Sequence, residues 1–385
     1  MTQTVDKIDQ TMNWQTLPSL AEWTVNTAIA IQQIPAPTFA ERQRASHVAS
    51  QFTELGLEQV TIDDFDNVYG LLAGENSASA IMVSAHTDTV FDEATNLEIK
   101  KVKKVIYGPG IGDNSMGVAG MLGAIRWFKT QNIRPPTDIW FVATSREEGL
   151  GDLGGMRKAY ERLKENIKSV VNIEGLAYGH IYSAGIAVRR LHIVATAEGG
   201  HSWFYFGRAS AIHAIVELGS RIASINPPKS PRTTYNIGLI DGGHSINSIA
   251  TQASLWLDMR SEERSALENL ERKIREQVSK LAKNDISFDI KIVGDRPSGH
   301  VPTQHIIVQN ALAILKRQGV QGVLEIGSTD GNIPLSDGCP TVTIGMTRGG
   351  NAHRLDEYIE VEPVSKGLRQ LIVLVLATSQ DSIEI

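Results

Sequence analysis

The sequence has only one cysteine in 385 residues, Cys339. An internal disulfide is therefore excluded, as is a zinc finger ligated by several cysteines, and a reducing cytoplasm is the compartment that fits. No block of lysines and arginines stands out and the formal net charge is −6, so nothing indicates nucleic acid or an anionic membrane as a partner. The N-terminal residues lack a basic start followed by an apolar stretch, so we expect no signal peptide.

Long apolar runs and internal repeats are also missing. The most apolar late segment, residues 368–379, is shorter than the roughly 20 residues that a membrane-spanning helix needs, and we interpret it as a buried helix. Apolar residues make up 42% of the chain and charged residues 21%, which is ordinary for a soluble globular protein. The length favours two domains over one.

The order of helical and strand patterns predicts how the chain is divided. Helices and strands alternate over residues 19–173, which predicts an α/β domain with helices covering a sheet. From about residue 187 the order becomes β-α-β-β-α-β, the ferredoxin-like arrangement, after which the α/β character resumes. We therefore predict a domain of residues 187–298 inserted into a first domain made of residues 1–186 and 299–385.

Side chains of the types that bind metals follow several of the predicted strands. In an open α/β sheet the ligand crevice lies beyond the carboxyl ends of the strands, so residues far apart in sequence can converge there. These side chains are His86 and Asp88 in "SAHTDT", Asp113 in "GIGDNSMG", Glu147 and Glu148 in "TSREEG", and Glu174 in "NIEG".

Each of these motifs has a metal-site interpretation and a simpler one. Asp88 can orient a metal-binding His86 by accepting its second N–H, or the pair can form a turn. Asp113 can bridge two cations or cap the helix that follows. An isolated Glu147-Glu148 pair is usually a solvated loop. Beside a metal, one carboxylate can bind the ion while the other accepts a proton from the bound water.

A nucleophilic side chain is a weaker candidate. "GGHSIN" matches the Gly-x-Ser-x-Gly elbow only at its first three positions, because Asn247 stands where the last glycine belongs. Cys339 lies in a predicted turn before a buried strand, where it is best interpreted as a small hydrophobic residue.

Together, these segments resemble the dizinc aminoacylase/carboxypeptidase family, which includes glutamate carboxypeptidase, acetylornithine deacetylase, succinyl-diaminopimelate desuccinylase and peptidase T. The resemblance covers nearly the whole chain, from "SAHTDT" through the insertion to "GGNAHRLDEYIEVE". It implies a mixed-sheet zinc-peptidase catalytic domain with an inserted ferredoxin-like dimerisation or lid domain. It also implies two divalent metal ions, zinc first, with cobalt and manganese as alternatives that the same ligand types serve.

The resemblance further implies a role for each residue of the motifs. One zinc would be held by His86 and Glu174, the other by Glu148 and His353, with Asp113 bridging both. His353 alone would be interpreted as a surface loop residue. Glu147 matches the general base of the family and Asp88 the acid that orients a ligand. A cis peptide bond is implied after Asp113.

In the inserted domain the resemblance implies contacts with the substrate. His201 matches a histidine that polarises the scissile carbonyl, across the dimer interface in several members. Asn247 and Arg260 match residues that hold a substrate carboxylate. The alternatives are a turn at the end of a strand for Asn247 and an ion pair with a following glutamate for Arg260. His244 competes with His201 for its role.

The expected activity is metal-dependent hydrolysis of an amide bond in small peptides or N-acyl amino acids by a dizinc-activated water, as in carboxypeptidases. An N-acyl-amino-acid deacylase, a di- or tripeptidase and a non-catalytic ligand-binding homologue remain alternatives. Glu174 stands where many aminopeptidase-type members carry aspartate, which disfavours a tripeptide aminopeptidase. The expected partners are the substrate and a second copy of the chain, in a homodimer formed through the inserted domain.

Overall fold

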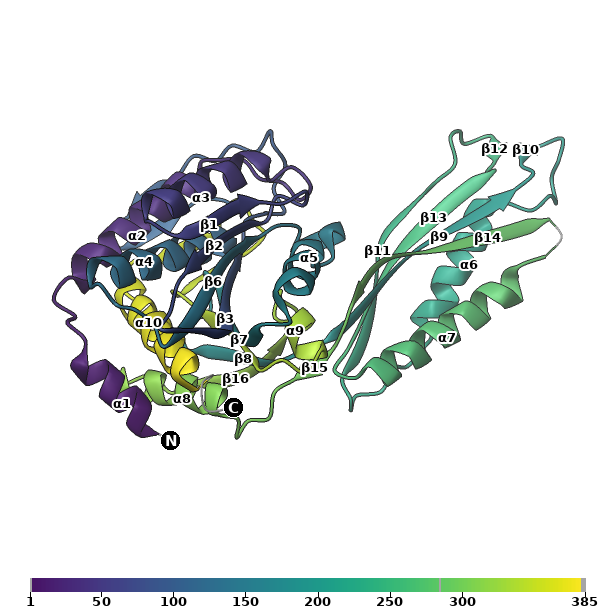
Figure 1. Cartoon of the computed structure of the whole chain (residues 1–385). Coiled ribbons are helices and arrows are strands. Elements are labelled where there is room, and N and C mark those ends of the chain that lie inside the picture. The colour runs from purple at the N-terminus through teal and green to yellow at the C-terminus, as the bar shows by residue number, and fades with distance from the viewer. Residues whose placement is uncertain (1, 284, 382–385) are drawn as a thin grey trace. The chain divides into compact units, whose positions relative to one another are not determined.

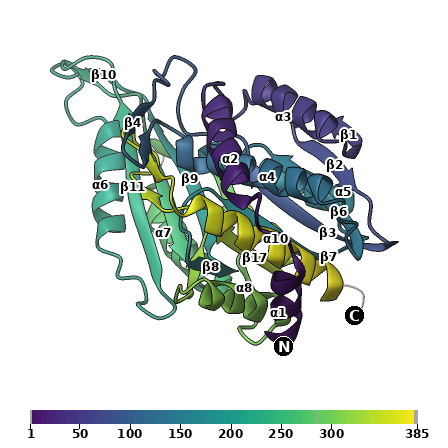
Figure 2. The ribbon, with the colours of Figure 1, turned by 90° about the vertical axis from the view of Figure 1, so that its left-hand side faces the viewer.

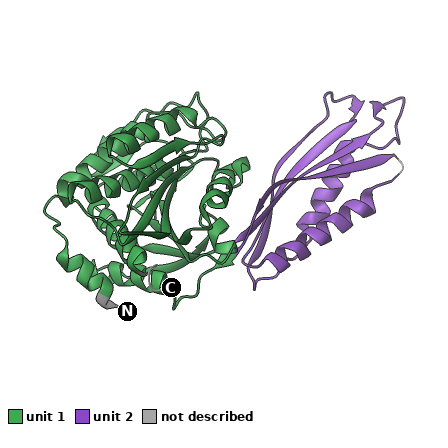
Figure 3. Ribbon diagram, in the orientation of Figure 1, with its two compact units in different colours: residues 1–185, 299–385 green, residues 186–298 purple. Residues whose placement is uncertain are grey.

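The structure, a computed structural model, describes residues 2–283 and 285–381. The chain forms two compact units, which Figure 3 distinguishes by colour. Unit 1 consists of Met1–Gly185 and Gly299–Ile385, and unit 2 of Ile186–Ser298.

Unit 1 is built on a mixed sheet of nine strands among the described residues. Their order is β1-β2-β6-β3-β7-β17-β8-β15, and β16 also pairs with β8. The central strands β6, β3, β7 and β17 run parallel, whereas the pairs β1–β2, β2–β6 and β8–β15 are antiparallel. The strands are β1 (Glu58–Ile62), β2 (Val68–Leu72), β3 (Asn76–His86), β6 (Thr137–Thr144), β7 (Ile167–Glu174), β8 (His180–Gly185), β15 (Gly299–His300), β16 (Val323–Gly327) and β17 (Thr341–Gly345). The predicted mixed α/β fold is thereby confirmed.

Helices cover both faces of this sheet, which explains the continuous apolar runs of its central strands. In β3, Ile81 and Val83 belong to the larger core, while Ala80 and Met82 belong to the smaller one. Helices α2, α4 and α10 enclose the larger core, and α5 and α9 the smaller one (Figure 1). The helices of unit 1 are α1 (Thr2–Thr11), α2 (Leu17–Gln32), α3 (Arg42–Glu54), α4 (Gly117–Thr130), α5 (Gly154–Leu163), α8 (Ile306–Arg317), α9 (Asn332–Ser336) and α10 (Val364–Asp381).

Helix α1, near the N-terminus, packs against α8 and against α10, the last helix of unit 1. Asp9 accepts hydrogen bonds from Arg369 of α10 at 2.7 Å and from Arg317 of α8 at 3.2 Å. Figure 2 shows α1, α8 and α10 side by side. The apolar C-terminal segment is the buried helix expected from the sequence. Among the described residues, no helix combines the length and apolar character needed to cross a bilayer.

A small antiparallel sheet positions two of the motifs. Its strands β18 (Gly349–Gly350), β19 (Tyr358–Glu360), β5 (Val105–Tyr107) and β4 (Lys100–Val102) pair in that order. Strand β5 leads into the loop of Asp113, and the hairpin between β18 and β19 carries His353. Segments about 250 residues apart in sequence, such as Ile106 and its partner Ile359, therefore meet in one sheet.

Unit 2 has the ferredoxin-like order β-α-β-β-α-β. Its antiparallel sheet runs β11-β13-β9-β14, and α6 and α7 pack on it over a core of their own. The elements are β9 (Ala187–Ala197), α6 (Ala211–Ala223), β11 (Thr233–Gly242), β13 (Gln252–Ser261), α7 (Arg264–Leu281) and β14 (Ile286–Arg296), with a short ladder of β10 (Gly200–His201) and β12 (Ser248–Ile249).

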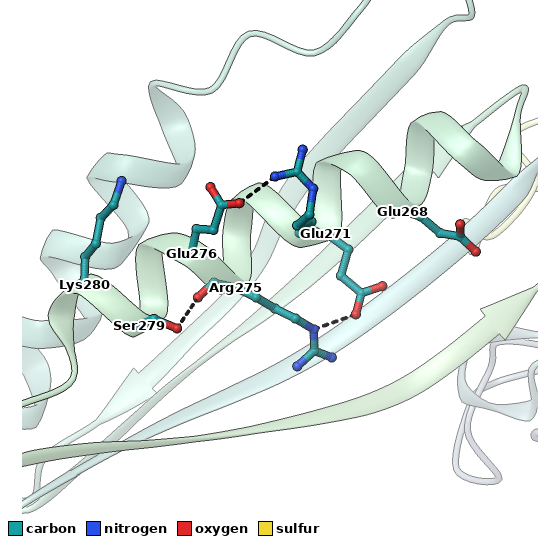
Figure 4. Close-up of a pocket in the computed structure, with 7 residues that line it drawn as sticks. Glu268, Glu271, Arg275, Glu276, Ser279 and Lys280 are labelled. Atoms are coloured by element: carbon teal, nitrogen blue, oxygen red, sulfur yellow. Dashed lines mark hydrogen bonds and ion pairs between the residues drawn. The ribbon is translucent and has the colours of Figure 1, made fainter.

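Helix α7 carries one ion pair on its exposed side and another next to the sheet. Arg272 donates to Glu276 at i,i+4 spacing. Arg275 donates to Glu271 at the same spacing, and Figure 4 labels both residues of this pair. Glu271 also pairs with Arg189 of β9, which fastens the helix to the sheet.

Candidate metal centre

The candidate residues gather at one edge of the unit 1 sheet because three parallel strands end there. Strand β3 ends at His86, β6 at Thr144 and β7 at Glu174. His86 is the register partner of Thr144, so the "TSREEG" turn starts beside the histidine. This edge is the carboxyl side of the sheet, where ligands bind in open α/β folds.

Asp113 lies between two histidines that come from opposite ends of the chain. Its Oδ1 is 3.1 Å from His86 Nε2, and its Oδ2 is 3.0 Å from His353 Nε2. Glu174 Oε2 lies 3.5 Å from His86 Nε2, and Glu148 Oε1 lies 2.9 Å from His353 Nε2. Each oxygen of Asp113 thus faces its own histidine and glutamate.

Two groups of possible ligand atoms result, and they share Asp113. The atoms of His86, Asp113 and Glu174 lie within 4.8 Å of one another, as do those of Asp113, Glu148 and His353. Imidazole nitrogens and carboxylate oxygens are the donors that zinc and similar divalent cations accept. Glu147 belongs to a third group, with His86 and Glu148, that does not include Asp113.

Asp88 is buried behind this cluster and binds the turn that carries both glutamates. Its Oδ1 accepts the backbone N–H of Glu147 and its Oδ2 that of Glu148, each at 2.9 Å, and Thr38 Oγ1 donates to Oδ2 at 2.8 Å. His86 Nδ1 lies 3.2 Å from the carbonyl oxygen of Asp88 and 3.5 Å from its Oδ1. When Nδ1 of the neutral ring donates on that side, the lone pair of Nε2 points toward Asp113 and Glu174, where a metal ion would take it.

The loop of Asp113 is irregular and tightly packed. Gly110 is left-handed (φ +71°), Asp113 has non-helical angles, and the Asp113-Asn114 peptide bond is cis. Asn114 Nδ2 donates to the carbonyl of Ile173 in β7 at 2.9 Å. A Cβ on Gly175 would lie 1.8 Å from the carbonyl oxygen of Gly112, so only glycine fits after Glu174.

Two loop residues of the site adopt left-handed backbone conformations that are uncommon outside glycine. They are Arg146 (φ +55°) and His353 (φ +66°). The backbone N–H of Arg146 donates to buried Glu41, and its guanidinium lies over the ring of Phe65 at 4.1 Å. The His353 side chain is 51% exposed, whereas that of His86 is 2% exposed, so the cluster opens to solvent on the His353 side.

The pKa values of the clustered side chains show that several negative charges are crowded together in a buried site. Burial raises the pKa of Glu148 and of Glu174 to about 7, with neighbouring carboxylates adding to the shift. Hydrogen bonds to Asp113 and Glu148 raise the pKa of His353 to about 10. Burial alone would lower the pKa of His86, but its contacts with Asp113, Asp88 and Glu174 raise it well above the usual range. Bound cations would relieve this crowding of negative charge, so the donor set fits divalent ions.

The sequence matches the family model described as peptidase family M20/M25/M40 over residues 82–377. The chain belongs to this family. The match includes every predicted residue of the cluster and the whole of unit 2. The prediction of a metallopeptidase/amidohydrolase related to the aminoacylases and carboxypeptidases is thereby confirmed.

The named proteins that this chain is similar to have different activities. The chain is 23% identical to a succinyl-diaminopimelate desuccinylase of Corynebacterium glutamicum over 341 residues, covering 86% of this chain and 90% of that protein. It is 26% identical to an acetylornithine deacetylase of Yersinia pseudotuberculosis over 361 residues, covering 84% and 88%.

Solved structures show the same fold. Aminopeptidase PepT from Bacillus cereus aligns with a TM-score of 0.75 and 23% identity over 93% of this chain and 98% of its own. A Bacillus subtilis protein described as a dinuclear metal binding peptidase of the M20 family aligns with a TM-score of 0.70 and 17% identity, over 94% and 99%.

Sequence reasoning missed several buried acids beside the candidate ligands, among them Glu357 and Asp330. Glu357 accepts the backbone N–H groups of Gly112 and Asp113, and burial raises its pKa to about 7. Asp330 accepts the hydroxyl of Thr144 at 2.5 Å, and burial, with Glu147 nearby, raises its pKa to about 8. Glu357 lies in the same motif as His353, which is a usable signal, whereas "GSTDGN" reads as an ordinary turn.

The predicted catalytic residue His201 and the predicted substrate-binding residues Asn247 and Arg260 all lie on the exposed surface of unit 2. His201 of β10 is paired with Ser248 of β12, and the carbonyl of Asn247 accepts the N–H of Ser202, so His201 and Asn247 are neighbours. Arg260 Nε donates to Asp258 at 2.7 Å, so its ion-pair partner is not a following glutamate. His244 is exposed in the loop between β11 and β12.

Proposed function

We propose that the chain hydrolyses the amide bond of small peptides or N-acyl amino acids at a metal centre of two divalent ions in unit 1. The observation that carries this proposal is the position of Asp113, whose two oxygens face His86 and His353 at 3.1 and 3.0 Å. A carboxylate placed in this way would suit a site that holds two cations.

The chain offers a complete ligand set for these ions. His86 and Glu174 would hold one ion, Glu148 and His353 the other, and Asp113 both. Zinc is the proposed metal, because its usual ligands are imidazole and carboxylate. When bound, such ions polarise a carbonyl and lower the pKa of water towards 7.

Glu147 is the proposed acid and base. Its side chain is 6% exposed, and the Asp88 carboxylate fixes its backbone and that of Glu148 side by side. Water oxygen bonds to the carbonyl carbon while Glu147 accepts the water proton, and Glu147 then donates that proton to the amine as the C–N bond breaks. In this proposal the two adjacent glutamates have different roles, with Glu148 binding a metal ion and Glu147 acting as the base.

The remaining substrate contacts are proposed for unit 2. The exposed guanidinium of Arg260 and the amide of Asn247 would bind a carboxylate of the substrate, and His201 would stabilise the oxyanion. The named relatives include deacylases and the similar structures include peptidases, so both substrate classes belong in the test.

A homodimer through unit 2 is part of the proposal. Trp203 and Phe206, which follow His201, are 81% and 92% exposed, and Leu239 and Ile240 are 63% and 58% exposed on the edge strand β11. Exposed apolar side chains along an unprotected strand edge favour pairing with another chain.

The test compares the wild type with Glu147→Gln, which keeps the shape of the side chain but cannot accept the proton. Dipeptides and N-acetyl and N-succinyl amino acids are screened with added zinc or cobalt, and metal content is measured on the same samples. We expect two equivalents of metal in both proteins and turnover only in the wild type. A Glu147→Gln variant with near-normal turnover would sink this assignment, and a wild-type protein that binds no metal would sink the metal centre.

A further inference from the structure

Glu357 has an unusual set of contacts for an acidic side chain. It is fully buried, and its carboxylate accepts three backbone N–H groups from one loop. Oε1 lies 2.7 Å from the nitrogen of Gly112 and 2.9 Å from that of Asp113, while Oε2 lies 3.3 Å from that of Gly110. The carbonyl of Glu357 accepts a fourth N–H, from Gly108, at 2.8 Å.

The loop from Gly108 to Asp113 depends on these contacts because it has little regular structure of its own. Gly110 is left-handed, and Asp113 lies outside the helical region although helix α4 starts a few residues later. Buried N–H groups without a partner are strongly disfavoured in folded proteins. Glu357 is the hydrogen-bond acceptor for three such N–H groups, those of Gly110, Gly112 and Asp113.

Glu357 also belongs to the segment that carries a second candidate ligand. It follows His353 by four residues, and the N–H of Glu357 donates to the carbonyl of Arg354 at 3.0 Å. One residue thus fixes the loop of Asp113 against the loop of His353. The separation of 3.0 Å between Asp113 Oδ2 and His353 Nε2 depends on how these two loops are held.

We propose that Glu357 is the positioning residue that aims the shared ligand Asp113 at both ions. This inference rests on the proposed metal centre and adds to it a residue that touches neither ion nor substrate. Because Asp113 belongs to both ligand groups, release of its loop weakens the binding of both ions. Loss of a ligand that belongs to one group only, such as His353, weakens mainly the binding of one ion.

The experiment measures metal binding by calorimetry on chelator-treated protein, with zinc and then cobalt as the titrant. The variants are Glu357→Ala and Glu357→Gln, with Glu362→Gln as the matched control, since Glu362 lies nearby but is 76% exposed. His353→Ala is the one-ion reference. Melting temperatures of the metal-free proteins and hydrogen exchange of the peptide covering residues 108–116 are recorded alongside.

We expect Glu357→Ala to lower the affinity for both ions at least tenfold and to speed hydrogen exchange in residues 108–116. Glu357→Gln, which keeps one accepting oxygen, should recover part of the affinity, and Glu362→Gln should match the wild type. If Glu357→Ala does not fold, Glu357→Gln alone carries the test, with weakening of both ions as the required result.

Two outcomes overturn the proposal. A lowered melting temperature with two ions bound at wild-type affinity would make Glu357 a purely stabilising residue. Weakening of one ion only, as in His353→Ala, would mean that it acts through His353 and not through Asp113. Turnover is not the readout, so a wild type that binds two ions without hydrolysing amides would contradict the proposed function and leave the role of Glu357 intact.

Discussion

The backbone N–H of Glu148 donates to Asp88 Oδ2 over 2.9 Å, which fastens the turn after β6 to the end of β3. The other oxygen of Asp88 accepts the N–H of Glu147 in the same way. A single buried carboxylate therefore sets the position of both glutamates and lies beside His86 as well. This arrangement makes Asp88 the most informative residue to change outside the ligand set.

Asp88→Asn should lower activity or metal affinity by roughly 10–100-fold, the usual cost of losing a group that orients ligands. The new amide nitrogen would face a backbone N–H that needs an acceptor, so one of the two glutamates would lose its support. Steady-state kinetics and metal titration check this, with the exposed Asp92→Asn as the control. An Asp88→Asn enzyme within twofold of the wild type in both measurements would show that the turn holds itself.

Removal of metal should destabilise unit 1. A ligand that binds only the folded state adds about 2.7 kcal/mol of stability when present at 100 times its Kd, so each ion that a chelator removes should cost on that order. Thermal unfolding with a chelator, and again after excess zinc is restored, measures the effect. Identical melting curves in both conditions would contradict a metal centre in this protein.

Asp330 should make the stability of the metal-free protein depend on pH. Its pKa is about 8 in the folded chain against an ordinary value of 3.8, so between these values the folded state holds one more proton than the unfolded state. The free energy of unfolding should therefore fall as pH rises through this range, by about 1.4 kcal/mol per unit. Asp330→Asn keeps an oxygen for Thr144 but removes this titration. Denaturant unfolding of both proteins at pH 5 to 8 checks the difference, and parallel slopes would refute it.

Gly175→Ala should disrupt the junction between β7 and the loop of Asp113. The added Cβ would lie 1.8 Å from the carbonyl oxygen of Gly112, a backbone atom that cannot move without shifting the Asp113 loop. We expect loss of metal binding or of soluble protein. Gly219→Ala in α6 is the matched control, because its nearest contact would be 3.7 Å away, and a helical glycine-to-alanine change stabilises by up to about 1 kcal/mol. Normal metal content in Gly175→Ala would contradict the packing.

The strands that carry the site were predictable because they are long, apolar and followed by glycine or charged residues. The alternation expected over residues 19–173 is found, and β3 and β7, which end at His86 and Glu174, lie within it or one residue past its end. The ends of such strands predict where ligands gather, which placed His86 and Glu174 near each other in principle. Residues 368–379, expected as a buried helix from their apolar character, lie within α10.

Other elements carry no comparable signal. Helix α1 begins "TQTVDKIDQT", a polar segment whose helix depends on packing and on the ion pairs of Asp9 with Arg317 and Arg369. Strand β16 is largely exposed and gains its structure from pairing with β8. The contact of Glu357 with Gly112 joins residues 245 positions apart, and no local pattern reports such a contact. Structure that depends on hydrogen bonds between residues far apart in sequence cannot be predicted from local sequence patterns.

The pairing of Gly185 with Gly299 in unit 1 has a consequence for how the chain can be cut and rejoined. These residues are the two points at which the chain leaves and re-enters unit 1, and within unit 2 the strands that begin and end it are paired as well, Val188 with Arg296. Each unit therefore brings its own two chain crossings together. A tight Asn-Gly turn can span a pair such as Gly185 and Gly299. We therefore expect that the 113 residues of unit 2 can be replaced by such a turn without breaking any strand pairing of unit 1.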